Sequence, residues 1–92
     1  MGKTAENVRF TLENSDHEQF YCVLKKEADY TQQFEQVFSI QKGYGFSVRC
    51  HDHSLELYDY FAGEARAAFT ILHTSETNEP VLYQLQKTER QA

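Results

Sequence analysis

The spacing of hydrophobic and polar positions predicts three β-strands in this chain. In segment 8–13, VRFTLE, hydrophobic residues alternate with polar ones, as in a strand with one buried face. Segment 45–51, GFSVRCH, alternates in the same way. Segment 81–87, VLYQLQK, is a third strand, and Pro80 before it favours a sheet edge because proline cannot donate a ladder hydrogen bond. The side chains predicted to face the core from the first two segments are Val8, Phe10, Leu12, Phe46, Val48 and Cys50.

Segment 52–73 has a different spacing, which predicts a helix. Its hydrophobic residues recur at steps of three and four, and this spacing gives a helix one apolar stripe. Asp52 or Ser54 caps the start of this helix. Gly63 opposes the interpretation, since glycine inside a helix costs about 1 kcal/mol. A break there, with a strand at 67–73, is the competing interpretation. The stripe consists of Leu55, Tyr58, Ala62, Ala65, Phe69 and Leu72.

Segment 15–41 permits two interpretations. In the first, residues 19–26 form a hairpin with the first strand, and a helix over residues 30–38 follows. In the second, a helix comes first and residues 34–40 form a strand. The first is favoured because Phe, Tyr, Cys and Val together, as in QFYCVLKK, are typical of a strand.

Both interpretations predict the same fold class, α+β. We expect a mostly antiparallel sheet of three to four strands, covered on one face by one or two helices. The 92 residues suffice for a single domain, 1–92, with an ordered core over about residues 7–87 and frayed polar ends. Hydrophobic residues make up 40% and charged residues 25%, a composition typical of ordered globular domains.

The net charge of −5 favours partners with basic surfaces and disfavours binding to nucleic acid, because its phosphates are repelled. No segment is apolar enough to span a membrane, and the first residues lack a secretory leader pattern. The two cysteines suit a reducing compartment. We therefore expect a cytoplasmic protein that does not associate with membranes.

Segment 42–49, KGYGFSVR, resembles the signature octamer of RNA-recognition modules through its first five positions. The resemblance implies that Tyr44 and Phe46, beside Lys42, stack on the bases of single-stranded RNA. The helix-first interpretation of the preceding segment gives the element order of that family. Strand alternation argues against this function, because exposing both aromatics would turn Arg49 unpaired into the core. A turn followed by a core strand is the favoured interpretation.

The histidines suggest a metal site. On a strand, His51 and His53 share a face, and His17 or His73 is a possible third ligand. Cys50 points the other way and cannot join them, and no third group orients it for nucleophilic catalysis. Surface histidines and a buried thiol are the simpler interpretation, so we expect no metal, no cofactor and no enzymatic activity.

Acidic residues carry the functional hypothesis. Asp52, Glu56 and Asp59 recur along one side of the predicted helix, with Tyr60 nearby, and form a surface for a basic partner. We therefore predict a non-enzymatic, acidic protein-binding module. Chains this small, acidic and free of motifs are common among phage and plasmid accessory proteins, such as anti-CRISPR and anti-restriction proteins. The predicted role is accordingly stoichiometric inhibition of nucleic-acid-handling machinery, and single-stranded RNA binding is the alternative.

Overall fold

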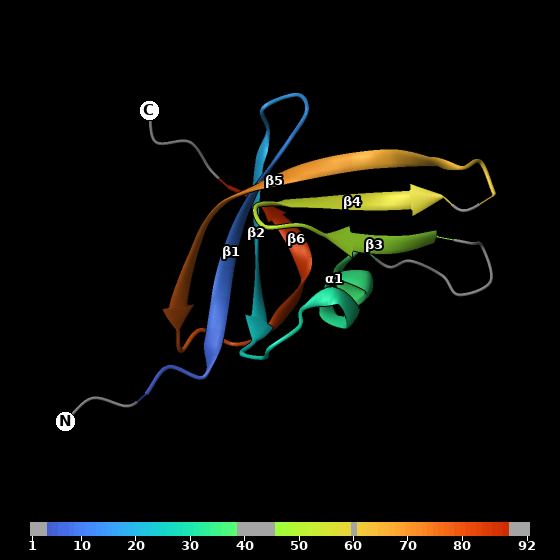
Figure 1. Cartoon of the computed structure of the whole chain (residues 1–92). Coiled ribbons are helices and arrows are strands. Elements are labelled where there is room, and N and C mark those ends of the chain that lie inside the picture. Colours follow the sequence, from blue (N-terminus) through green and yellow to red (C-terminus); the bar gives the residue numbers. More distant parts are fainter. Residues whose placement is uncertain (1–3, 39–45, 60, 89–92) are drawn as a thin grey trace.

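A six-stranded antiparallel sheet and one short helix make up the part of the chain that the computed structural model describes, residues 4–38, 46–59 and 61–88 (Figure 1). The strands follow the order β3-β4-β5-β1-β2-β6 across the sheet. The class α+β is confirmed, but the prediction of three to four strands is wrong. The elements are β1 (Asn7–Asn14), β2 (Gln19–Lys25), α1 (Thr31–Val37), β3 (Phe46–Cys50), β4 (Ser54–Asp59), β5 (Glu64–Thr77) and β6 (Leu82–Lys87).

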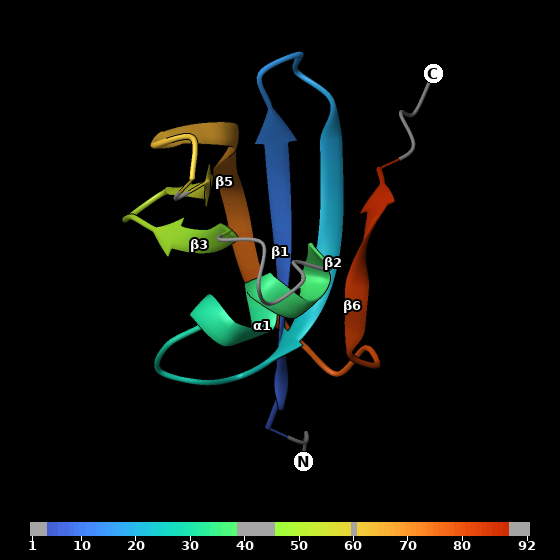
Figure 2. The same ribbon diagram turned by 90° about the vertical axis from the view of Figure 1, so that its right-hand side faces the viewer.

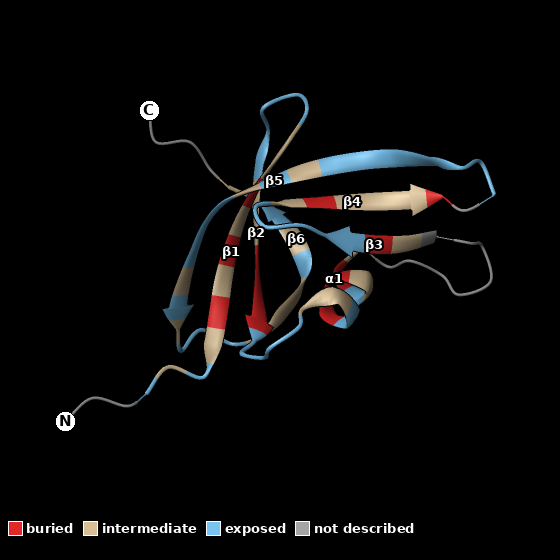
Figure 3. Cartoon of the chain, viewed as in Figure 1, coloured by how far each residue is buried: buried red, intermediate tan, exposed pale blue. Residues whose placement is uncertain are grey.

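The sheet is curved, and α1 lies against its concave face, with β3 on one side of the helix and β6 on the other (Figure 2). Alternate residues of β1 and β2 point toward the helix, because successive side chains of a strand face opposite ways. They enclose Phe34 of α1, which is 1% exposed. Figure 3 shows buried residues on β1, β2 and α1, whereas the first half of β5 is exposed. The core cluster consists of Val8, Phe10, Leu12, Cys22, Leu24, Phe34, Val37, Val48 and Leu55.

The hairpin interpretation of the segment 15–41 is confirmed. β1 and β2 pair in register from Asn7 opposite Lys25 to Glu13 opposite Gln19, and α1 follows them in the chain. The helix-first alternative is wrong, and with it the element order of the RNA-recognition family. The segment forms a strand because its side chains can be buried on both faces of the sheet: Cys22 and Leu24 enter the core cluster, and Val23 between them is also buried.

The predicted helix over 52–73 is wrong, because this segment forms β4, a turn and most of β5. Gly63 adopts a positive φ of 71°, which glycine tolerates and a helix does not contain. Leu55 is fully buried and pairs with Phe69 on β5, whereas Ala65 is exposed. The competing interpretation is confirmed only in part: a strand does follow the glycine, but it begins at Glu64, and the strand before the glycine, β4, was in neither interpretation.

In β3, the described side chains agree with the predicted alternation except at one residue, and the side chain of Phe46 lies outside the described part. Val48 is buried and Arg49 is exposed, as strand alternation predicts. Cys50 was expected in the core but is exposed, because it ends β3 at the mouth of a pocket. The third predicted strand is β6, which lies at an edge of the sheet.

Candidate functional site

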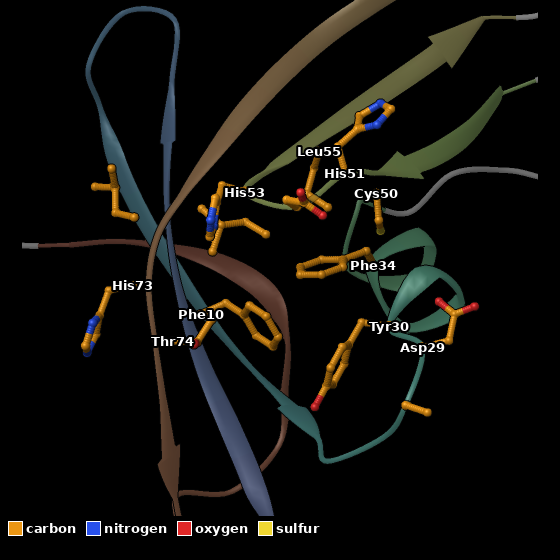
Figure 4. A pocket seen from close by; sticks show the side chains of 14 residues that line it. Phe10, Asp29, Tyr30, Phe34, Cys50, His51, His53, Leu55, His73 and Thr74 are labelled. Atoms are coloured by element: carbon orange, nitrogen blue, oxygen red, sulfur yellow. The ribbon is translucent and has the colours of Figure 1, made fainter.

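A pocket of about 550 Å³ opens between the start of α1 and strands β1, β4 and β5 (Figure 4). Its volume lies within the range of sites that bind small molecules or side chains, about 300–1,000 Å³. The inner wall is apolar. It is formed by Phe10, Phe34, Leu55 and Ile71.

Three aromatic rings from separate elements meet at this wall (Figure 4). The Phe10 ring on β1 packs edge-on against Tyr30, with centroids 5.0 Å apart, and against Phe34, with centroids 5.1 Å apart. Edge-to-face contacts of this kind favour a defined arrangement of the rings. The Tyr30 hydroxyl accepts a hydrogen bond of 3.2 Å from the Glu27 backbone N–H, which ties the ring to the loop before α1.

Two carboxylates stand at the mouth of the pocket. Asp29 accepts hydrogen bonds from the Thr31 backbone N–H, at 2.9 Å, and from the Thr31 hydroxyl, at 2.7 Å. These bonds, the backbone one first, lower the pKa of Asp29 below its ordinary value and keep it ionised. Asp52 lies exposed in the β3–β4 connection, and it has no hydrogen-bond or ion-pair partner within the described part of the chain.

The permanently charged groups among the described lining residues of the pocket are carboxylates, those of Asp29 and Asp52. None of the described lining residues is a lysine or an arginine. The pKa of Cys50 is raised above its ordinary value, first by burial and also by the charges of Asp29 and Glu35, whereas its contact with Thr31 acts in the opposite direction. A thiol whose ionisation is opposed by two carboxylates is a poor nucleophile at neutral pH. The site therefore favours binding a cation over nucleophilic chemistry.

We expect only one cysteine to react with a thiol reagent in the native protein. Cys22 is completely buried, and burial raises its pKa to about 12, so it is both inaccessible and protonated. Cys50 is exposed and should be modified, although more slowly than a free cysteine. Counting modified thiols by mass spectrometry before and after addition of urea checks this, with both cysteines reacting in urea. Rapid native modification of Cys22 would contradict the described core.

The predicted acidic row is not a single surface. Glu56 lies 3.5 Å from His51 on the convex face of the sheet, whereas Asp59, three residues on, turns inward and is 5% exposed. In a strand, residues an odd number apart face opposite ways, so the helical spacing does not bring these carboxylates together. Asp52 alone lines the pocket. Tyr60 lies outside the described residues.

The histidines are only partly brought together. His51, His53 and His73 line the pocket, but the rings of His51 and His73 point away from the aromatic wall (Figure 4). His17 lies in the β1–β2 turn, 3.9 Å from Glu13. Within residues 4–38, 46–59 and 61–88, no three metal-binding side chains are grouped so that they could hold an ion.

The residues implied by the RNA-recognition resemblance are not described beyond one backbone position. Lys42 and Tyr44 lie outside the described residues, and Phe46 is described only as the first residue of β3. The stacking surface implied by the resemblance therefore lies outside the described residues, whereas the order of elements along the chain is not that of the family.

Comparison with protein-family models, curated proteins and solved structures gave no match. The function is therefore argued from the site alone. In the described part of the chain, no helix is long and apolar enough to cross a membrane. Sequence reasoning missed the aromatic wall and Asp29. The one available signal was the acidic and aromatic pair Asp29–Tyr30 before the helix that the favoured interpretation of 15–41 predicts.

Proposed function

We propose that this chain is a non-enzymatic protein-binding module that receives a basic side chain of its partner in the pocket described above. The observation that carries the proposal is the combination of an apolar, aromatic wall with two carboxylates at the mouth and no basic lining residue among those described. A long basic side chain is complementary to this pocket, because its apolar stem ends in a positive charge. The pocket therefore matches it in both shape and charge.

Elsewhere on the described surface, several carboxylates are paired with basic side chains. Ion pairs join Arg9 to Glu79 at 2.8 Å, Lys26 to Glu76 at 2.9 Å and Lys87 to Glu18 at 3.1 Å. Such exposed pairs contribute little to stability, but they neutralise the surface locally. Asp29 and Asp52, which have no ion-pair partner in the described part of the chain, place two negative charges at the mouth of the pocket. This favours fast association with a basic surface.

The partner class follows from this chemistry. Proteins that handle nucleic acids present rows of Lys and Arg to bind phosphates, and a carboxylate-bearing module competes for those residues. We propose that the chain inhibits such a protein stoichiometrically, as accessory proteins of phages and plasmids do. Because the interaction is charge-assisted, it weakens as salt is raised.

Removing the two mouth carboxylates should weaken binding of a basic ligand about tenfold, because their charges face the bound cation. The variant is Asp29→Asn with Asp52→Asn, in which asparagine keeps an acceptor for Thr31. The matched control, Asp16→Asn with Glu64→Gln, removes the same charge from exposed sites away from the pocket. The measurement is fluorescence anisotropy with a labelled arginine–glycine peptide at low salt. Equal losses in both variants would show that only net charge matters, which would overturn the proposal.

A further inference from the structure

The pocket continues into a longer groove. A second pocket of about 500 Å³ shares Phe10, Tyr30 and Thr74 with the first. β1 forms the floor of both, and the banks are the segment 26–30 and the strand β5. At the far end the Lys26 ammonium group lies 2.9 Å from a carboxylate oxygen of Glu76. This ion pair crosses the groove and joins segment 26–30 to β5.

We infer that this groove binds an extended segment of the partner, with an arginine side chain in the first pocket and an uncharged neighbouring residue in the second. The inference rests on the proposed function, since it specifies which basic residue the site takes and how that residue is presented. The two halves of the groove differ in charge. The first half carries the carboxylates of Asp29 and Asp52 and has no lysine or arginine among its described lining residues, whereas the second half contains the Lys26 ammonium group, paired with Glu76, beside Glu27.

Arginine suits the first pocket better than lysine for two physical reasons. A guanidinium is planar and stacks on aromatic faces such as that of Tyr30, which is part of the aromatic wall. It is also more weakly hydrated than an ammonium, so it enters an apolar pocket at a smaller desolvation penalty. The wall around Phe10 offers no buried carboxylate that would compensate for dehydrating an ammonium.

The second pocket argues against a second basic residue. A cation placed there would lie near the Lys26 ammonium and would compete with it for Glu76. An uncharged side chain contacts Val8 and Phe10 without disturbing that pair. The preferred segment is therefore an arginine beside an uncharged residue, and not a run of basic residues.

The test uses three small probes that differ only in the side chain: N-acetyl-arginine methylamide and the corresponding lysine and citrulline compounds. Citrulline keeps the shape of arginine and lacks the charge. Each is titrated into the ¹⁵N-labelled protein up to about 20 mM, a range suited to millimolar binding. We expect the arginine probe to shift the backbone amide signals of Tyr30, Cys50 and Asp52. Binding of the lysine probe should be about fivefold weaker, and citrulline should cause no shift.

A charge reversal distinguishes this pocket from general attraction. Asp52→Lys places a cation at the pocket mouth and should abolish the shifts, whereas Asp16→Lys makes the same change in the β1–β2 turn and should leave them intact. Both residues are exposed, so both variants should fold. Equal binding of the lysine and arginine probes, or equal loss in both variants, would overturn the inference. If no probe binds while the arginine–glycine peptide still does, the inference fails and the proposed function stands. If neither binds, both fail.

Discussion

Replacing Phe34 by alanine is expected to lower the free energy of unfolding by about 3–5 kcal/mol, the loss typical of emptying a buried aromatic site. Phe34 is 1% exposed, and its ring lies between Phe10, 5.1 Å away, and Phe38, 6.4 Å away. It also joins α1 to the concave face of the sheet. The total free energy of unfolding of a small domain is about 5–15 kcal/mol, so the variant should be close to unfolding. Urea denaturation followed by circular dichroism measures the change.

The same substitution at an exposed phenylalanine provides the control. Phe61 stands in the β4–β5 turn and is 81% exposed, so Phe61→Ala should change the free energy of unfolding by less than about 0.5 kcal/mol. Comparable losses at both positions would mean that the described burial does not determine the stability of this domain.

The second large effect is expected at Asp59, whose carboxylate holds the β4–β5 turn together. Its Oδ1 accepts hydrogen bonds from the backbone N–H of Phe61, at 2.9 Å, and of Ala62, at 3.1 Å. Its Oδ2 accepts one from Arg66 Nε at 3.0 Å. Asp59→Asn removes the charge and one of these acceptors, so the urea midpoint should fall clearly below that of the wild type. Asp52→Asn, an exposed control with no such bonds, should leave the midpoint unchanged.

The contribution of Asp59 should also depend on pH. Its hydrogen bonds, led by the one from Ala62 and supported by Arg66, lower its pKa in the folded protein. In the unfolded chain an aspartate has a pKa of about 3.9. The stabilisation is therefore complete above that value and is lost as the pH falls through the lower folded pKa. The difference in urea midpoint between the wild type and Asp59→Asn should be constant from neutral pH to about pH 5 and should close at lower pH. A difference that persists to the lowest accessible pH would contradict this. The lowered pKa values of Glu18 and Asp29 affect both proteins alike.

Strands with one buried and one exposed face could be predicted from the sequence. In β1 the residues Val8, Phe10 and Leu12 are buried and their neighbours are not, so alternation of the side chains is visible directly. α1 was found because its hydrophobic residues follow a segment already assigned to a strand. In these regions the local hydrophobic pattern agrees with the burial that the tertiary structure imposes, so the pattern predicts the secondary structure correctly.

The first half of β5 could not be predicted in this way. Residues 64–68 are exposed on both faces, so burial imposes no alternation there. Ala65, Ala67 and Ala68 are strong helix formers. In addition, Leu55, Ala65 and Phe69 belong to a set of hydrophobic residues with helical spacing. The decisive signals were local to the turn, where Gly63 has a positive φ and Asp59 binds the following backbone N–H groups.

The pocket was only partly visible in the sequence. Its aromatic wall combines Phe10 of β1 with Tyr30 and Phe34, and no local spacing relates the strand residue to the two at α1. They meet because β1 runs through the middle of the sheet while α1 crosses its concave face. Asp52 was selected from the sequence as part of a helical acidic row. Asp52 remains a candidate site residue for another reason, because it lies in the connection between β3 and β4, which lines the pocket.

The strand order affects how this protein folds while the ribosome is still synthesising it. The β1–β2 hairpin is synthesised first, but its two sheet neighbours, β5 and β6, come much later, and Asn7 pairs with Thr77. At a synthesis rate of about 5–20 residues per second, the hairpin waits for seconds with both edges open. Open edges of this kind invite pairing with other nascent chains. Slower translation between residues 26 and 64 should therefore increase aggregation, and faster translation should reduce it.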